Sequence, residues 1–141
     1  MNAEVRALVA DGRLREAAAA LGHPFEVDGV VVEGDRRGKL LGFPTANLDV
    51  DPEQVLPPRG IYVGEALAHR AAISIGVNPH YGGNERRIEA FLLDFEGDLY
   101  GERLVVELWD RLREERVFAS EAELVEQIGR DVEATRAASR P

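Results

Sequence analysis

A polar segment in the first third of the chain carries residue types that can bind phosphate and a metal ion. Residues 34–39 read Gly-Asp-Arg-Arg-Gly-Lys, and a compact polar turn, Gly-Phe-Pro-Thr-Ala-Asn, follows at residues 42–47. Backbone N–H groups and cationic side chains of such a loop can contact phosphate oxygens. Thr45 and Asn47 offer neutral oxygens on one side of an extended segment, and Mg²⁺ often takes only one or two protein ligands. The segment therefore suggests a phosphate and magnesium site.

Taken by itself, the same segment is more often an ordinary solvated turn, and that interpretation stays open at this point. The spacing excludes two common nucleotide-binding motifs. The chain has no G-x-x-x-x-G-K-[S/T] sequence, and no Rossmann glycine motif opens a helix after a strand.

Glu89 is the candidate general base. It lies in a run of alternating side chains, residues 87–93, in which Ile88, Ala90 and Leu92 share one face and Glu89, Phe91 and Leu93 share the other. A carboxylate beside apolar side chains is partly desolvated, which makes it a better proton acceptor near neutral pH. The alternative, favoured by spacing alone, is a surface ion pair with the neighbouring arginines at positions 86 and 87.

Short β-branched runs broken by Gly, Pro and Asn occupy residues 25–109 and predict an all-β barrel or sandwich. The candidate strands are Phe25–Glu33, Gly60–Ala68, Ala71–Val77, Arg87–Leu93 and Leu104–Leu112, with turns at residues 57–60, 69–70 and 96–98. Residues 3–21 read as two short helices separated by Gly12, with a stop at residues 22–24. A capping box of Ser120 and Glu123 opens a helix over residues 120–137, whose apolar stripe, Leu124, Ile128 and Val132, should pack on the barrel.

Composition limits the function classes. The 141 residues suit one domain, include no cysteine, and contain no apolar run of membrane-spanning length. The net charge of −9 disfavours general binding to nucleic acid or to anionic membranes. A cytoplasmic protein that binds a small phosphorylated ligand through local basic clusters is the expectation.

Four stretches in register resemble riboflavin kinase. They are residues 34–47, residues 74–79 (Ser-Ile-Gly-Val-Asn-Pro), residues 88–95 followed by Asp-Leu-Tyr-Gly at 98–101, and residues 112–118 (Leu-Arg-Glu-Glu-Arg-Val-Phe) with the helix behind them. The resemblance covers the chain from about residue 24 to its end.

The resemblance implies a mostly β fold: a six-stranded Greek-key closed barrel with a C-terminal α-helix and a short N-terminal helical lead-in. It implies transfer of the ATP γ-phosphoryl group to the 5′-hydroxyl of riboflavin, giving FMN, with Mg²⁺ or another divalent cation. By position, the implied roles are as follows: Glu89 is catalytic; Thr45 and Asn47 hold the metal; Gly34, Lys39, Thr45, Leu92, Asp94 and Tyr100 bind ATP; and Arg113, Arg116 and Phe118 bind the flavin.

The chain departs from the family pattern at Arg36, His80 and Phe91, which bears on the phosphate loop and on flavin affinity. Residues 1–23 resemble an interdomain linker and residues 24–141 the kinase domain. Many bacterial relatives place a nucleotidyltransferase domain with a His-x-Gly-His motif before this module, and the motif is absent here. The chain is therefore expected to be either an excised module of a longer protein or a stand-alone kinase, and to make FMN but not FAD. The alternative function is a flavin- or nucleotide-binding regulatory module that has lost catalysis.

Overall fold

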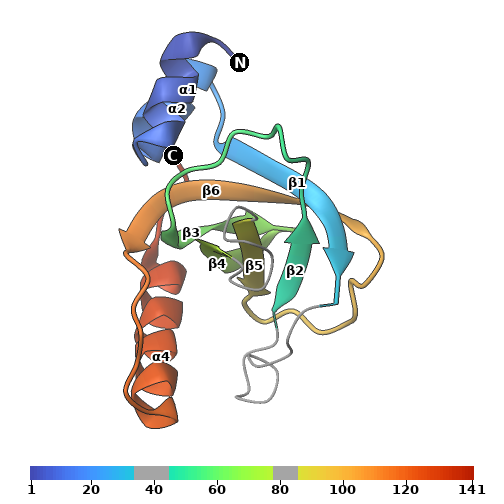
Figure 1. Cartoon of the computed structure of the whole chain (residues 1–141), viewed down its shortest axis with the longest axis vertical. Helices are drawn as coiled ribbons and strands as arrows, with labels where there is room; N and C mark the ends of the chain where they lie inside the picture. Colours follow the sequence, from blue (N-terminus) through green and yellow to red (C-terminus); the bar gives the residue numbers. More distant parts are fainter. Residues whose placement is uncertain (34–44, 78–85) are drawn as a thin grey trace.

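The computed structural model describes residues 1–33, 45–77 and 86–141. Six strands form a closed antiparallel barrel, two short helices cover one end of it, and a longer helix runs beside it (Figure 1). The elements are α1 (Ala3–Ala10), α2 (Leu14–Leu21), β1 (Phe25–Val32), β2 (Ala46–Asp49), β3 (Gly60–Ala66), β4 (His69–Val77), β5 (Arg86–Leu92), β6 (Arg103–Arg113) and α4 (Glu121–Ala137).

The strand order around the barrel is β1-β2-β5-β4-β3-β6. Three strands, β3, β4 and β5, follow one another as hairpins, and β6 returns to pair with β3. That arrangement is a Greek key, so the predicted fold is confirmed. All five strands predicted from the residue pattern are present.

The sixth strand, β2, lies in the segment that the sequence indicated as a compact turn. Ala46 and Asn47 belong to a strand that pairs with β1 on one side and β5 on the other. With four residues, two of them Asn and Asp, β2 has neither the length nor the β-branched composition that marks a strand in sequence. Pairing with its two neighbours decides its conformation.

The turn between β3 and β4 also differs from the prediction. The sequence placed it at His69 and Arg70, but both begin β4, and the chain reverses at Leu67 and Ala68. These two residues have φ values of 51° and 64°. Two consecutive positive φ angles suit a two-residue hairpin, because they match the twist of the paired strands. Neither position carries Gly or Asn, so no local sequence signal marked this turn.

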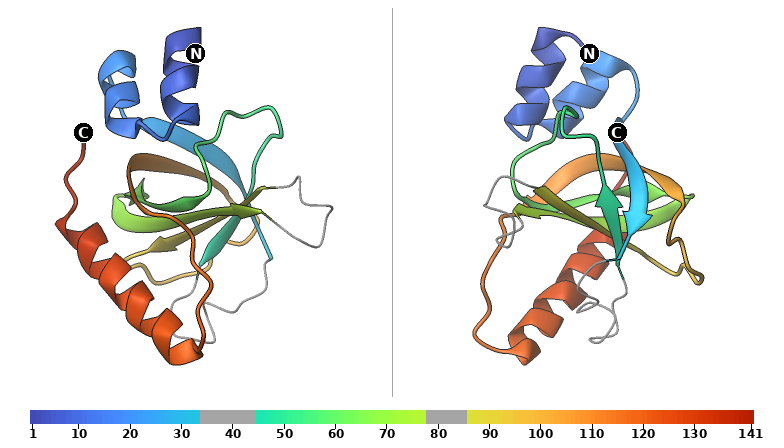
Figure 2. Two further views of the ribbon diagram at one scale, coloured as in Figure 1. Left: turned by 60° about the vertical axis from the view of Figure 1, so that its left-hand side comes forward. Right: turned by 45° about the vertical axis from the view of Figure 1, so that its right-hand side comes forward.

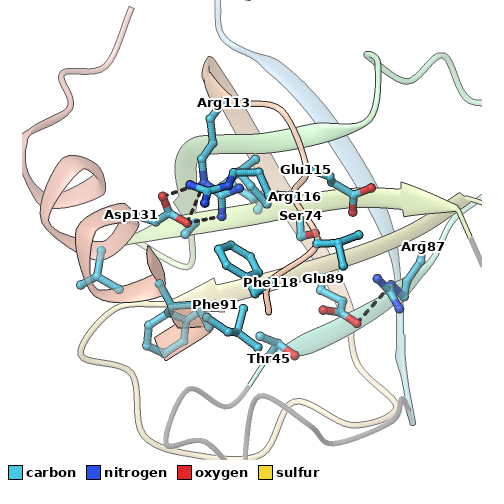
Figure 3. A pocket seen from close by; sticks show the side chains of 17 residues that line it. Thr45, Ser74, Arg87, Glu89, Phe91, Arg113, Glu115, Arg116, Phe118 and Asp131 are labelled. Atoms are coloured by element: carbon cyan, nitrogen blue, oxygen red, sulfur yellow. Dashed lines mark hydrogen bonds and ion pairs between the residues drawn. The ribbon is translucent and has the colours of Figure 1, made fainter. Parts of the chain in front are cut away.

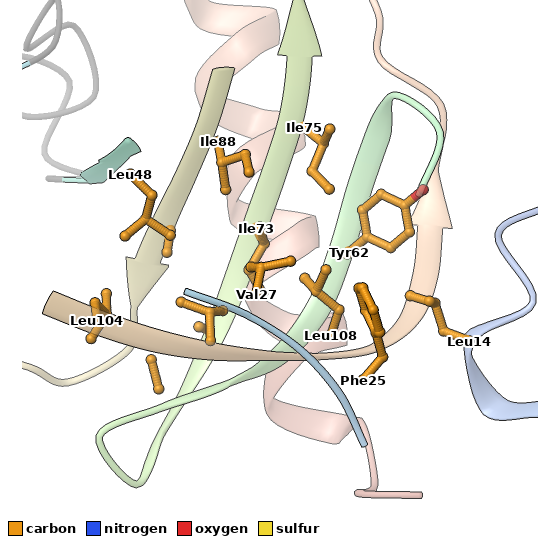
Figure 4. Packing of buried hydrophobic residues seen from close by; sticks show 14 of the residues in the cluster. Leu14, Phe25, Val27, Leu48, Tyr62, Ile73, Ile75, Ile88, Leu104 and Leu108 are labelled. Atoms are coloured by element: carbon orange, nitrogen blue, oxygen red, sulfur yellow. The ribbon is translucent and has the colours of Figure 1, made fainter. Parts of the chain in front are cut away.

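Inward-facing side chains of all six strands fill the barrel (Figure 4). On β5, Ile88, Ala90 and Leu92 are buried as the alternation predicted, whereas Glu89 and Phe91 are only half-buried on the opposite face. Close strand crossings require small residues. A Cβ on Gly64 would lie 1.7 Å from the backbone oxygen of Glu107, so no larger side chain fits there.

The N-terminal helices belong to the same folded body as the barrel. Val5 and Val9 of α1 and Leu14 and Ala17 of α2 are buried in the core cluster at one end of the barrel (Figures 1 and 2). Gly22 ends α2 with a φ of 83°, as its position in the sequence predicted. The helices before residue 24 thus pack on the barrel that follows it. That residues 23 and 24 mark a domain boundary stays a prediction.

Helix α4 has the predicted N-cap, because the Ser120 hydroxyl accepts a hydrogen bond from the Glu123 backbone N–H at 3.2 Å. Its packing differs from the prediction. The fully buried stripe is polar and consists of Gln127, Asp131 and Thr135. The apolar stripe, Leu124, Ile128 and Val132, is half-buried and lines a cavity. Within the described residues, no helix has the length and apolarity needed to cross a bilayer.

Candidate active site

A row of side chains crosses the outer face of the barrel over five strands. Asn47 on β2 lies opposite Glu89 on β5, Glu89 opposite Ser74 on β4, Ser74 opposite Ile61 on β3, and Ile61 opposite Arg113 on β6. Residues directly opposite each other on paired strands project to the same face. Strands that are remote in sequence therefore place an amide, a carboxylate and a hydroxyl side by side, with a guanidinium beyond Ile61 in the same row.

A cavity of about 410 Å³ covers this row from Glu89 to Arg113, whereas Asn47 is not among its lining residues. Its floor is the outer face of β3, β4 and β5, and its walls are residues 115–118 and α4 (Figure 3). The apolar part of the lining includes Ile61, Ala72, Phe91, Phe118, Leu124 and Ile128. Thr45, Glu89 and Arg113 supply polar groups at its edge. A cavity of this size with an apolar floor and charged groups around it suits a small, flat ligand with a polar side chain.

The surroundings of Glu89 agree with both interpretations drawn from the sequence, the ion pair with an arginine and the carboxylate beside apolar side chains. Its Oε1 lies 3.4 Å from Nε of Arg87, so the predicted ion pair with a neighbouring arginine exists. Only 18% of its side chain is exposed, however, and it lines the cavity together with Phe91 and Thr45 (Figure 3). The carboxylate is therefore placed where a hydroxyl of a bound ligand can reach it.

Arg113, Arg116 and Phe118 lie together at the opposite wall. The guanidinium carbons of Arg113 and Arg116 are 5.9 Å and 5.0 Å from the centroid of the Phe118 ring. In Figure 3 this ring projects into the cavity between Arg113 and Glu89. The three predicted flavin residues are thus brought together, across the cavity from the predicted catalytic residue.

Those predicted ATP residues that the structure describes are not brought together in this cavity. Gly34 and Lys39 lie outside the described residues. Leu92 is buried inside the barrel, and Tyr100 is 60% exposed in the connection between β5 and β6. Asp94 accepts hydrogen bonds from Arg136 at 2.7 Å and 2.9 Å, which lower the pKa of this exposed carboxyl. Among the described residues of this set, Thr45 is the one that lines the cavity.

The predicted metal ligands have chemistry that fits Mg²⁺. Asn47 lies directly opposite Glu89, and Thr45, two residues earlier, lines the cavity beside it. Hydroxyl, amide and carboxylate oxygens at one edge form a hard-donor set of the kind that magnesium prefers. No cluster of three or more carboxylate or histidine ligands occurs among the described residues. A metal here would thus depend on few protein oxygens and on ligand phosphates.

Two residues that contact the arginines of the cavity wall were not predicted from the sequence. Asp131 and Gln127 of α4 hydrogen-bond with Arg113 and Arg116 respectively. Their spacing of four residues puts them on one helical face, and this polar stripe is the sequence signal that could have found them.

Comparison with known proteins gives a consistent result. A family model described as "Flavokinase: Riboflavin kinase" matches residues 21–139. A bifunctional riboflavin kinase/FMN adenylyltransferase of Escherichia coli K12 is 42% identical over 132 residues, which cover 90% of this chain and 42% of the relative. The chain therefore spans less than half the length of this curated relative.

Two solved structures are similar. A structure described as a macrolide-efflux protein from Streptococcus pneumoniae superposes with a TM-score of 0.91 at 37% identity, covering 99% of this chain and 47% of the other. A riboflavin kinase from Trypanosoma brucei superposes with a TM-score of 0.64 at 28% identity, covering 82% of this chain and 79% of the other.

Proposed function

Because the chain belongs to the riboflavin kinase family, we propose that it transfers the γ-phosphoryl group of ATP to the 5′-hydroxyl of riboflavin. The observation that carries the proposal is the position of Glu89 in a cavity whose opposite wall presents Phe118 in contact with two arginines. An aromatic ring beside two cations suits a planar heteroaromatic ligand, and a carboxylate across the cavity suits the hydroxyl at the end of its side chain.

The proposed reaction forms one bond and breaks one. The riboflavin 5′-oxygen attacks the γ-phosphorus, the bond from that phosphorus to the β,γ-bridging oxygen breaks, and the products are FMN and ADP. Glu89 accepts the proton of the attacking hydroxyl and later returns it to solvent. Catalysis of phosphoryl transfer consists largely of positioning and charge neutralisation, so one carboxylate and a shaped cavity are sufficient protein groups.

The ATP site and the metal belong to the same proposal. Thr45 and Asn47 would hold Mg²⁺ at the edge of the cavity near Glu89. Bound there, the ion would neutralise charge on the phosphate oxygens. Gly34, Lys39, Leu92, Asp94 and Tyr100 remain the proposed ATP contacts, with the first two in the segment outside the described residues. A cytoplasmic location is part of the proposal.

The alternative of a regulatory binder without catalysis finds no support in the described residues. Thr45, Asn47 and Glu89 are all present, and the last two lie side by side. The E. coli relative is named for two activities, riboflavin kinase and FMN adenylyltransferase. A nucleotidyltransferase domain in a longer native chain is therefore a proposed partner of this module.

The test is to incubate the purified chain with riboflavin, ATP and Mg²⁺ and to separate riboflavin, FMN and FAD by chromatography. FMN as the sole product would support the proposal. FAD would show an additional adenylyl-transfer activity within the chain, contrary to the expectation of FMN alone. Binding of riboflavin without any product would favour the regulatory alternative.

A further inference from the structure

A chain of four hydrogen-bonded side chains joins α4 to the arginines of the cavity wall. The Asp131 carboxylate accepts hydrogen bonds from Nε of Arg113 at 3.0 Å and from Nη2 at 2.7 Å. Nε2 of Gln127 donates to Oδ1 of Asp131 at 3.0 Å, and Oε1 of Gln127 accepts from Nη1 of Arg116 at 3.2 Å. Two residues of one helix thus hold both arginines.

Three of the four side chains in this chain of contacts are shielded from solvent. Side chains of Asp131 and Arg113 are 11% and 20% exposed and Gln127 is buried, whereas Arg116 is exposed. The bidentate contact fixes the plane of the Arg113 guanidinium, since two parallel N–H groups must align with one carboxylate. If the Asp131 carboxylate were removed, the partly buried Arg113 would lose this alignment, and its positive charge would face the cavity without a paired carboxylate.

The two arginines in turn contact the ring that projects into the cavity. Arg113 and Arg116 both lie against Phe118, and neither of their α4 partners makes a described contact with Glu89 on the opposite wall. Residues 115–118 follow β6 and run beside α4 (Figures 1 and 2). The helix therefore sets the position of this wall through Gln127 and Asp131.

We propose that Asp131 and Gln127 are positioning residues for the planar acceptor substrate: they orient Arg113 and Arg116, and through them Phe118, so that the ring system binds with its hydroxyl toward Glu89. This inference rests on the proposed function. It assigns the two helix residues an effect on flavin affinity and little effect on MgATP, because neither makes a hydrogen bond to any described residue that is predicted to contact MgATP.

The test compares Asp131→Asn and Gln127→Met with the wild-type chain. Riboflavin Kd is measured by quenching of flavin fluorescence, and KM values for riboflavin and MgATP are measured by FMN formation. Asp131→Asn should raise riboflavin Kd and KM about tenfold, and Gln127→Met a few-fold. The KM for MgATP and kcat should each change less than about twofold.

Glu126→Gln is the matched control, because Glu126 lies on the exposed face of the same helix and pairs with Arg130 at 2.7 Å. It should leave all constants unchanged. Thermal melts identify any variant that does not fold, and Gln127→Met provides the test should Asp131→Asn fail to fold.

A double-mutant cycle shows whether Asp131 acts through Arg113. In an Arg113→Gln background, adding Asp131→Asn should raise riboflavin Kd by less than about twofold. An unchanged Kd in Asp131→Asn, full additivity in the cycle, or an equal rise in the KM for MgATP would overturn the inference. Failure of the proposed function has a different signature, namely no FMN from the wild-type chain, and riboflavin Kd still reports on Asp131 in that case.

Discussion

Replacing Glu89 with Gln preserves the shape of the side chain and removes its ability to accept a proton. General-base catalysis contributes about 10²–10⁴ in rate. At about 1.36 kcal/mol for each tenfold change, this corresponds to about 2.7–5.4 kcal/mol of activation free energy. We therefore expect kcat to fall at least about a hundredfold, with riboflavin Kd changed less than about threefold.

The effect on folding should be much smaller. The Arg87–Glu89 contact is long, at 3.4 Å, and Arg87 is 38% exposed, so solvent partly screens the pair although Glu89 is only 18% exposed. Such pairs contribute about 1 kcal/mol or less to stability. For a domain of this size that loss lowers Tm by only a few degrees. A hundredfold loss of turnover at 25 °C cannot then come from unfolding.

The assay is FMN formation at saturating riboflavin and MgATP, with riboflavin Kd and a thermal melt on the same preparation. Glu102→Gln is the control, because Glu102 is exposed, precedes β6 and does not line the cavity. It should retain wild-type kcat. A Glu89→Gln variant with kcat within tenfold of wild type would refute the assignment of Glu89 as the base.

Three further predictions test the metal site, the packing and the electrostatics. Combining Thr45→Ala with Asn47→Ala should abolish Mg²⁺-dependent ATP binding in a calorimetric titration while riboflavin Kd is kept; unchanged MgATP affinity would show that the metal binds elsewhere. Gly64→Ala should destabilise the fold by more than about 4 kcal/mol, since its Cβ would lie 1.7 Å from a backbone oxygen. Gly76→Ala should cost far less, because its Cβ would meet the movable end of a glutamate side chain at 2.6 Å, and equal losses in urea unfolding would contradict this packing argument. Hydrogen bonds from Arg140, and a weaker contribution from the Trp109 indole, lower the pKa of Glu107. The contribution of these contacts to folding stability is therefore fully present above the ordinary glutamate pKa and is lost as pH falls through the lowered value. Glu107→Gln should thus lower Tm at pH 7 and progressively less below about pH 4. A Tm difference independent of pH would exclude this linkage.

Local sequence determined much of this protein. Alternation in residues 87–93 gave the buried and exposed faces of β5, and Ser120 with the helical pattern after it gave the start of α4. These features depend on periodicity and on hydrogen bonds between near neighbours, so they can be derived without the fold. The resemblance to riboflavin kinase added the closed barrel and the candidate site.

Other features depended on contacts between distant segments. The conformation of β2 and the row from Asn47 through Glu89 to Arg113 are set by strand register, which burial of one face and the pairing of remote segments decide together. The turn at Leu67 and Ala68 follows from hairpin twist rather than from turn-forming residues.

Helix α4 shows the same division between sequence and tertiary structure. Its apolar stripe, Leu124, Ile128 and Val132, was visible in the sequence and was expected to pack on the barrel. The structure instead buries Gln127 and Asp131, because arginines from β6 and the segment after it supply their hydrogen-bond partners. A polar side chain can be buried at low cost only where such partners exist. The sequence by itself thus determined where the helix lies along the chain and which apolar stripe faces the barrel across the cavity, and only the tertiary structure decided that the adjacent polar stripe is the more deeply buried one.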